Sequence, residues 1–408
     1  MDLNLIVRGF VHASGERSSL VVDRRTGLPV YAANLYLTCR VRNASQSHAS
    51  VAAYAGCLVV LFRFCDEFGL ELSERFRSQR FLENHELENF RNYCTYNFDR
   101  LAGYADITVD PLRLVIKDRR RVESATQHRR LSVAADFLRW WARQHLPPQE
   151  REPEALRNMI DFLLNSRPSP KGRNAGLIDR AFSEQQHQCL LETVEIDSSK
   201  NPFGFSVRRR NRLIILIEGA LGIRGGELLN LRISDFDFSN NKLIIVRRAD
   251  QADDTRATQP LVKTSDRVMV LANWLVGEVH QYIIEDRRNV PGAKKCPYLF
   301  ITYKSGPTQG QALSIAAYKK IWKTLQLCDP LLSDASGHRL RHTWNNQHSE
   351  LVDSLGLSEA EQEATRSRSM GWKEGSGTAR IYNKRFIEKQ AFKVSILLQN
   401  KMMEGKLK

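Results

Sequence analysis

A short segment rich in proline and glycine most constrains how this chain can fold. It reads Arg167-Pro168-Ser169-Pro170-Lys171-Gly172-Arg173-Asn174. The two prolines and the glycine break helices, and the polar side chains offer nothing to a hydrophobic core. With 408 residues and 42% apolar content, the chain can build two or three separate cores. We therefore expect a linker over residues 167–176, with a helical domain at 46–166 before it and a second domain at 177–385 after it.

Apolar residues recur at intervals of three and four along the first half, which is the spacing of a buried helix face. One helix is predicted to begin at Ser47 and to end before Gly69, a typical C′ residue. Further helices are predicted near residues 85–98, 125–144 and 154–164. The first half therefore indicates a domain of antiparallel helices.

Residues 1–45 are predicted to be an N-terminal extension with a possible hairpin. Residues 20–23 and 30–31 have strand-like composition and flank a turn that contains Gly27 and Pro29. A small accessory sheet and an ordered leader both fit this pattern, and we favour the leader.

The second half mixes helices with strands. Ser183-Glu184-Gln185-Gln186 fits a capping box at the start of a helix, and an apolar helix is predicted over 207–220. Strands are predicted at 242–246 and 261–270, joined by a polar, acidic loop, and most of the remainder has helical spacing. The fold class is therefore mainly α with a small β-sheet or hairpin, in two domains of which the second is α+β.

The chain carries 61 Lys and Arg against 46 Asp and Glu, a formal net charge of +15. An excess spread along the chain favours a polyanionic partner, and nucleic acid is the most common one. Two basic clusters flank the start of the helix at 125–144. Each alone is typical of a solvated helix face, but together they favour a surface that follows a phosphate backbone. With the basic linker residues, the candidate DNA contacts are Arg119, Arg120, Arg121, Arg129, Arg130, Lys171 and Arg173.

The seven cysteines are odd in number and include no Cys-x-x-Cys pair. This pattern argues for a reducing compartment and against a disulfide framework or a zinc site. No stretch approaches the ~20 consecutive apolar residues of a membrane-spanning helix. A cytoplasmic, nucleoid-associated protein without a membrane partner is expected.

One stretch near the C-terminus combines side chains suited to a phosphodiester. Two imidazoles and two arginines stand together in His338-Arg339-Leu340-Arg341-His342, and an indole follows at Trp372. Attack on a phosphodiester builds negative charge on the non-bridging oxygens, and a guanidinium matches them in charge and geometry. Arg341 and Arg224 are the candidates. Glu227, three residues after Arg224, is the expected partner that orients it.

Tyr382 supplies a phenol that nearby cations would favour as phenolate, since its ordinary pKa is near ~10. Lys263 could protonate the departing alkoxide, because burial beside other cations lowers a lysine pKa. Lys242 on the neighbouring strand is the competing candidate. The two histidines and the Trp372 indole would complete the set of donors. No carboxylate cluster suits a catalytic Mg²⁺, so neither a metal nor another cofactor is expected.

Taken in order, these motifs resemble those of the tyrosine recombinases, the phage integrase family. The resemblance rests on Gly222-Ile223-Arg224-Gly225-Gly226-Glu227-Leu228, Val262-Lys263-Thr264, His338-Arg339-Leu340-Arg341-His342-Thr343, Met370-Gly371-Trp372 and Ile381-Tyr382. These stand for the first arginine box, the hairpin with the catalytic lysine, the second box, the usual Leu-Gly-His and the nucleophile. The resemblance covers about residues 175–395, whereas the N-terminal helices match the family's core-binding domain only in pattern.

Three features depart from the family pattern. Trp372 replaces the usual histidine, and an indole can donate a hydrogen bond but cannot shuttle a proton. Trp372 and Tyr382 are 382 − 372 = 10 positions apart, one more than the usual spacing. The loop before Lys263 is long and acidic, so Lys242 stays open as the catalytic lysine.

The resemblance implies a site-specific recombinase or integrase that cuts and rejoins DNA strands by transesterification. Tyr382 would form a 3′-phosphotyrosyl link and free a 5′-hydroxyl, and this bond would store the energy without ATP or a metal. It also implies double-stranded DNA clamped by both domains and a homotetramer on paired sites, monomeric or dimeric off DNA, with accessory DNA-bending proteins. The C-terminal segment 386–408 would dock on a neighbouring protomer or pack on its own domain.

Two other functions share much of this chemistry. A DNA-binding protein that kept the fold without turnover would not need the intact set Arg224, His338, Arg341 and Tyr382. A type IB topoisomerase relaxes supercoils through the same intermediate without paired sites. The helical first half and the amphipathic C-terminal segment favour recombination over that reading.

Overall fold

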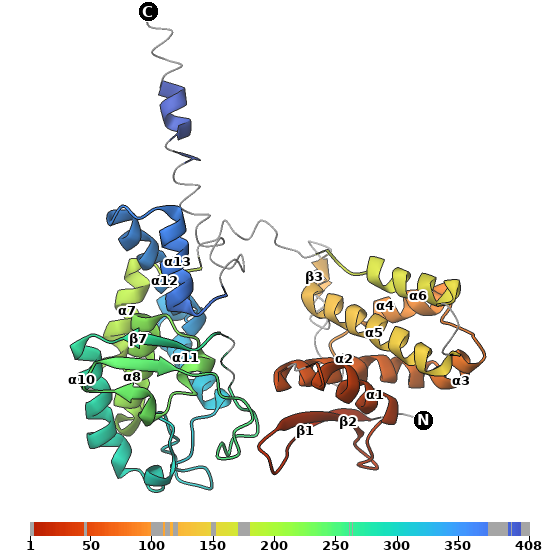
Figure 1. The fold of residues 1–408 in the computed structure, drawn as a ribbon, viewed down its shortest axis with the longest axis horizontal. Helices are drawn as coiled ribbons and strands as arrows, with labels where there is room; N and C mark the ends of the chain where they lie inside the picture. The colour runs from red at the N-terminus through yellow and green to blue at the C-terminus, as the bar shows by residue number, and fades with distance from the viewer. Residues whose placement is uncertain are drawn as a thin grey trace, which may run out of the picture. The chain divides into compact units, whose positions relative to one another are not determined.

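The structure is a computed structural model in which the chain forms two compact units, residues 1–178 and 179–408 (Figure 1). Each unit has its own hydrophobic core and is described separately. The residues that the structure describes are 4–44, 47–98, 109–110, 115–116, 121–147, 152–169, 180–260, 262, 264–373, 391–392 and 394–400. The predicted linker at 167–176 overlaps the end of the first unit, and most of it lies outside the described residues.

An antiparallel hairpin opens the first unit. Strand β1 (Leu5–Val11) pairs with β2 (Arg17–Asp23), and the chain reverses between them near Gly15, whose φ is 87°. Almost every residue of β2 is buried, and the strand packs against helix α2. Leu5 and Val21 belong to the core of the unit. The N-terminal extension is therefore an accessory sheet built into that core, and the leader that we favoured is wrong.

The predicted pairing of residues 20–23 with 30–31 forms only in part. The turn between the two segments exists, since Gly27 has a φ of 70°. An isolated bridge joins Val22 and Pro29, and the Val30 N–H donates to the Val21 carbonyl at 2.9 Å, but Tyr31 already begins helix α1. The partner of β2 comes instead from the residues before it.

Helices make up most of the rest of the first unit. They are α1 (Tyr31–Tyr36), the π-helix η1 (Leu37–Arg42), α2 (His48–Glu67), α3 (Leu72–Arg77), α4 (Asn84–Tyr93), α5 (Ser124–His145) and α6 (Glu154–Asn165), with the paired short strands β3 (Val109–Asp110) and β4 (Val115–Ile116). The four predicted helices are confirmed as α2, α4, α5 and α6. The Ser47 hydroxyl accepts a hydrogen bond from the Ser50 N–H at 3.3 Å, and Gly69 has a φ of 64°. These two residues begin and end α2 as predicted.

Helices α2 and α5 pack together at the centre of this unit. The Tyr36 hydroxyl from α1 donates to the Asp136 carboxylate at 2.5 Å, and Phe137 packs edge-on against the Tyr36 ring. In the described part of the chain, α2 is the one helix long and apolar enough to cross a membrane by composition. Half of its most apolar window is buried inside the unit. The same composition is typical of a core helix.

The cysteines differ sharply in exposure, and all seven are free. Cys57, Cys65 and Cys94 are buried in the first unit, and burial raises their pKa to about 11, 12 and 12, respectively. Cys39 of the first unit and Cys328 of the second are exposed.

The second unit is an α+β domain. Its helices and turns are α7 (Glu184–Val194), α8 (Phe205–Leu221), α9 (Gly225–Leu228), η3 (Ile233–Asp235), α10 (Asn273–Gln281), η4 (Tyr282–Asp286), η5 (Arg287–Asn289), η6 (Ala293–Lys295), α11 (Ile315–Cys328), η7 (Pro330–Leu332), α12 (Gly337–Ser354) and α13 (Glu359–Met370). Its antiparallel sheet has the order β5-β6-β7, formed by Phe236–Asp237, Lys242–Ile245 and Arg267–Val270. Strand β7 begins at Arg267, later than the predicted residue 261. The capping box is confirmed, because the Ser183 hydroxyl accepts from the Gln186 N–H at 3.2 Å and the Gln186 amide oxygen accepts from the Ser183 N–H at 3.1 Å.

Helix α8 is central to the second unit and leads the chain into the candidate site. It packs against α7, α10 and α12 and buries Leu213, Ile214 and Ile217 in the core. The helix ends at Gly222, which has a φ of 61°. A Cβ atom on this residue would lie 2.8 Å from the Trp344 ring, so both the backbone angle and the space require glycine. The turn at Gly222 brings Arg224 to the start of α9.

Candidate active site

Arg224 stands at the N-terminus of the short helix α9. Its backbone N–H donates to the Glu227 carboxylate at 2.8 Å, which fixes the backbone of the turn. Its Nη1 atom is buried and has no hydrogen-bond partner among the described residues. A buried donor without a partner costs about 1–3 kcal/mol, or more when charged, unless a ligand satisfies it. Arg224 therefore presents a guanidinium that is suited to bind an anion.

Arg341 lies in the second turn of α12, whose N-cap is Ser336. The side chain is 2% exposed, and its Nη1 donates to the Gly222 carbonyl at 2.6 Å. This bond joins α12 to the turn that carries Arg224. Both arginines line one pocket of the unit, although they come from different helices.

His338 stands one turn before Arg341, and its ring meets the edge of the His342 ring at 4.6 Å between centroids. Partial burial, followed by the positive charges of Arg341, Arg224 and Arg180, lowers the pKa of His338. Its neutral form is therefore favoured at neutral pH, and a neutral imidazole can accept a proton. The two arginine charges act on His338 because all three side chains line one pocket of about 600 Å³.

Trp372 reaches the same group from α13. That helix ends at Gly371, whose φ is 64°, and the chain turns so that the Arg341 guanidinium lies 5.5 Å from the Trp372 ring centroid. The structure thus brings Arg224, His338, Arg341 and Trp372 together from three separate segments, since His338 and Arg341 share α12. Two residues that the sequence analysis did not single out, Lys319 and Lys323 on α11, also line the pocket and add positive charge.

The sequence profile of the phage integrase family matches residues 181–386, which is just over half of the chain. This chain belongs to the phage integrase family. One solved structure with a similar fold is the XerH site-specific recombinase bound to palindromic difH substrate in a post-cleavage complex, with a TM-score of 0.50, 20% identity, and coverage of 84% of this chain and 79% of that chain. Another is the Tn1549 transposon integrase in complex with circular intermediate DNA, with a TM-score of 0.41, 16% identity, and coverage of 64% and 75%. A search of curated proteins finds no match.

The family and the fold make the protein a tyrosine recombinase of two-domain architecture, as the motifs predicted. The integrase-family match begins at residue 181, close to the start of the second unit at residue 179. Among the described residues no group of three or more His, Cys, Asp and Glu side chains is placed to hold a metal ion.

We expected Glu227 to pair with the Arg224 guanidinium, but the carboxylate has other partners. Its carboxylate oxygens bind the Arg267 guanidinium in two hydrogen bonds of 3.1 Å and accept a third from the Thr264 hydroxyl. Burial acts to raise the pKa of Glu227, but Arg267, Thr264 and the Arg224 N–H outweigh it and lower that pKa below its ordinary value. Glu227 therefore orients Arg224 through the backbone and stays ionised.

Arg267 also joins this site to the Trp372 turn. Its Nε donates to the Ser369 carbonyl at 2.8 Å, and a Cβ atom on Gly371 would lie 2.8 Å from its Nη1. The Ser265 N–H donates to the Gly371 carbonyl at 3.1 Å. Nothing in the local sequence pattern singled out Arg267, because its partners lie 40 and 102 residues away.

Two of the predicted catalytic residues, Lys263 and Tyr382, lie outside the described residues. The neighbours of Lys263 in sequence, Val262 and Thr264, are buried in the second unit, and Thr264 bonds to Glu227. The competing candidate Lys242 is exposed at the start of β6, where its charge acts on Asp237.

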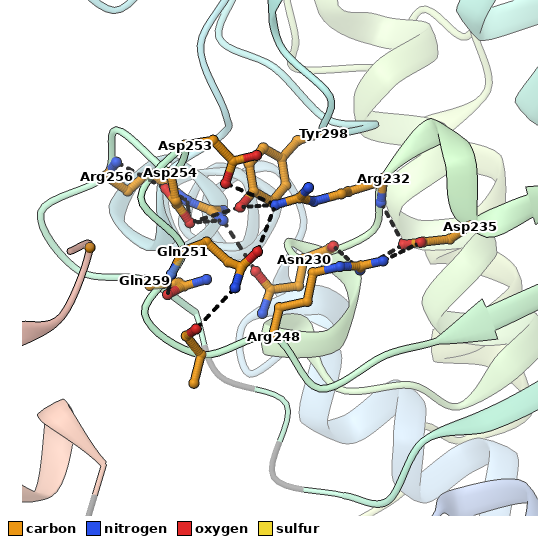
Figure 2. Close-up of polar contacts among 12 residues, drawn as sticks. Asn230, Arg232, Asp235, Arg248, Gln251, Asp253, Asp254, Arg256, Gln259 and Tyr298 are labelled. Atoms are coloured by element: carbon orange, nitrogen blue, oxygen red, sulfur yellow. Dashed lines mark hydrogen bonds and ion pairs between the residues drawn. The ribbon is translucent and has the colours of Figure 1, made fainter.

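The acidic loop before Lys263 is anchored by a buried polar network (Figure 2). Asp254 pairs with Arg256 at 2.7 Å and accepts from the Tyr298 hydroxyl at 3.2 Å. Arg256 donates further to the Leu229 and Leu313 carbonyls at 2.9 and 3.1 Å. The long, acidic loop before Lys263 is therefore fixed to the core of the unit.

The basic residues of the first unit divide into two kinds. Arg130 is used within the unit, where its Nη1 donates to the Cys94 and Tyr96 carbonyls at 3.0 and 2.7 Å. Arg121 and Arg129 are exposed. The remaining candidates Arg119, Arg120, Lys171 and Arg173 lie outside the described residues.

Proposed function

We propose that this chain is a site-specific DNA recombinase that cuts and rejoins strands through a 3′-phosphotyrosine intermediate. The observation that carries the proposal is the pocket in which Arg224 and Arg341 meet His338, with a buried Arg224 nitrogen left without a partner. Preorganised donors of this kind stabilise charge that develops on a phosphate during displacement. The fixed geometry also avoids the cost of reorganising solvent.

Each residue has a distinct part in the proposed reaction. The Tyr382 oxygen forms a bond to phosphorus while the bond to the 5′-oxygen breaks. The neutral His338 takes the phenol proton, and Lys263 gives a proton to the departing 5′-oxygen. Arg224, Arg341 and the Trp372 indole donate to the non-bridging oxygens. Attack by a 5′-hydroxyl of another duplex reverses these transfers and rejoins the strand.

The proposed partner is double-stranded DNA inside the cell, in the nucleoid. The XerH recombinase is bound to palindromic difH substrate in its structure, and the net charge of +15 supports a polyanionic partner here. The exposed Arg121 and Arg129 of the first unit would follow the phosphate backbone. Accessory DNA-bending proteins could assist the assembly.

We further propose a homotetramer on paired sites, with monomers or dimers off DNA. The supporting feature is a set of exposed apolar side chains near the C-terminus: Phe392, Val394, Ile396, Leu397 and Leu398. Exposed apolar side chains in such density mark a contact surface.

The test begins by finding the target sequence. The protein is incubated with sheared DNA from its host, denatured, and the DNA that remains covalently attached is sequenced at its 3′ end. A synthetic duplex of that site, nicked so that the freed fragment is lost, then traps the adduct for single-turnover measurements. Adduct formation that disappears in Tyr382→Phe supports the proposal. Retention of the adduct in that variant would show that another residue is the nucleophile.

The same substrate separates the alternatives. A DNA-binding protein without turnover shifts the duplex in a gel and forms no adduct. A topoisomerase relaxes a supercoiled plasmid that lacks the site, whereas a recombinase exchanges strands only between two copies of it.

A further inference from the structure

A buried carboxyl–phenol pair lies beside the pocket, and the proposed reaction does not use it. Glu218 in the last turn of α8 is 0% exposed, and the Tyr318 hydroxyl from α11 donates to its Oε1 at 2.6 Å. The other oxygen, Oε2, is buried and has no hydrogen-bond partner among the described residues. A buried carboxyl lowers the free energy of unfolding relative to an apolar residue of similar size, so its presence indicates a functional role.

The pair touches both arginine motifs at glycine positions. A Cβ atom on Gly225, the residue after Arg224, would lie 2.8 Å from Tyr318 Cζ. A Cβ atom on Gly337, the residue before His338, would overlap the Tyr318 hydroxyl and lie 2.7 Å from both Glu218 oxygens. The phenol therefore fills the space between the start of α9 and the start of α12. A residue larger than glycine fits at neither Gly225 nor Gly337 unless the phenol moves.

We propose that Glu218 and Tyr318 are positioning residues that set the spacing between Arg224 and the turn carrying His338 and Arg341. This inference rests on the proposed recombinase function. The Tyr318 ring is the spacer, and the hydrogen bond to Glu218 fixes how deeply the ring inserts. A displacement of about 1 Å at a catalytic group can lower the reaction rate 10²-fold. A spacer at this point can therefore change the cleavage rate without contacting DNA.

The charge state of Glu218 matters for this arrangement. Burial raises the pKa of Glu218 to about 8, while the hydrogen bond from Tyr318 acts in the opposite direction. Tyr318 from α11 contacts Glu218, and the other titratable and charged groups that line the pocket with that ring are Lys319 and Lys323 on α11, Arg224 at α9, and His338 and Arg341 on α12. Ionisation would place a buried charge on a carboxyl whose Oε2 has no hydrogen-bond partner among the described residues, and relief of that cost would move the pair out of its place between α9 and α12. The proposed pair is therefore competent with a neutral Glu218.

The first experiment measures the single-turnover cleavage rate and the DNA dissociation constant of the full chain on the mapped site. For Tyr318→Phe we expect cleavage to fall about 10–100-fold with the dissociation constant unchanged. The matched control is Tyr303→Phe, a half-buried tyrosine of the same unit whose ring lies 5.1 Å from the Arg210 guanidinium. Equal cleavage by the Tyr318 and Tyr303 variants would overturn the proposal.

The second experiment records the pH profile. Glu218→Gln keeps an acceptor for Tyr318 but cannot ionise, so it should cleave near the wild-type rate at pH 7 and lose the decline that the wild type shows above pH ~8. Persistence of the same decline in Glu218→Gln would overturn the role of Glu218.

A spectroscopic readout keeps this test apart from the proposed function. In protein labelled with ¹⁵N-histidine, the His338 signal, assigned by its loss in His338→Gln, should shift as Glu218 ionises and should not shift in Glu218→Gln. If the wild type forms no adduct with any DNA, the recombinase function fails. The histidine titration then still decides whether Glu218 acts on the pocket, and an unchanged titration in Glu218→Gln would reject it.

Discussion

Arg256 and Arg224 sit in the same unit and differ in how completely they are satisfied. Arg256 is 6% exposed and binds the Asp254 carboxylate, the Asn230 amide oxygen and two backbone carbonyls (Figure 2). Arg224 keeps a buried nitrogen that has no partner in the described part of the chain. The first arginine stabilises the fold, whereas the second holds its binding capacity for a ligand. Of these two arginines, the saturated one belongs to the scaffold, and the one with an unsatisfied nitrogen lines the candidate site.

The largest expected effect breaks the saturated side of this comparison. Arg256→Leu leaves the buried Asp254 carboxylate without its cation, and loss of one member of a buried pair costs about 3–5 kcal/mol. Chemical denaturation of the second unit should show this loss in the free energy of unfolding. The double variant Arg256→Leu/Asp254→Leu should recover part of it. A single variant as stable as the wild type would contradict the structural role of Arg256.

The next effect concerns the unsaturated side. Arg224→Lys keeps the charge but loses the forked donor, so cleavage should fall by ~10²–10³, the range for loss of one transition-state donor. The free energy of unfolding should change by less than ~0.5 kcal/mol. The control is Arg288→Lys, an exposed arginine of the same unit. A large loss of stability in Arg224→Lys would show that Arg224 is scaffold after all.

A smaller effect is expected for Arg267, a saturated arginine that supports residues of the candidate site. Arg267 is saturated, yet it holds Glu227 and the Gly371 turn that carries Trp372. Arg267→Lys should lower the free energy of unfolding by about 1.5–3 kcal/mol and also slow cleavage. A double-mutant cycle with Glu227→Gln measures their coupling. If the effects of the two substitutions were additive, Arg267 and Glu227 would not be coupled.

The most gradual expected effect, small at each step of pH, is a pH dependence of stability. Burial holds the pKa of Glu218 at about 8, above its ordinary value of 4.5. Between these values the native state binds a proton that the unfolded chain has released, so stability falls as pH rises through this window. The slope is at most ~1.4 kcal/mol per pH unit for one group. Denaturation of wild type and Glu218→Gln from pH 5 to 8.5 should show this slope only in the wild type. Parallel curves would contradict it.

Sequence reasoning succeeded where the determinant is local. Ser47 and Ser183 begin their helices because a side-chain oxygen binds a backbone N–H within the same turn. The convergence of Arg224, His338 and Arg341 was predicted from motif order, and the bond from Arg341 to the Gly222 carbonyl supplies its physical basis.

The misses came from contacts between distant segments. Glu227 was assigned to Arg224, its neighbour in sequence, but Arg267 from strand β7 outcompetes it as a bidentate partner. The Glu218–Tyr318 pair spans 100 residues and has no periodic signature. The N-terminal hairpin was misplaced because the turn at Gly27 was taken as its turn. The strand that pairs with β2 precedes it in the sequence.

The uneven exposure of the cysteines has a practical consequence. Cys39 and Cys328 offer one exposed thiol in each unit, while Cys57, Cys65 and Cys94 are shielded and hold their protons. With the half-buried Cys189 and Cys296 of the second unit replaced by serine, brief treatment with maleimide dyes should mark the chain once on either side of the linker. Energy transfer between the dyes would then report how far apart the two units are before and after DNA is added.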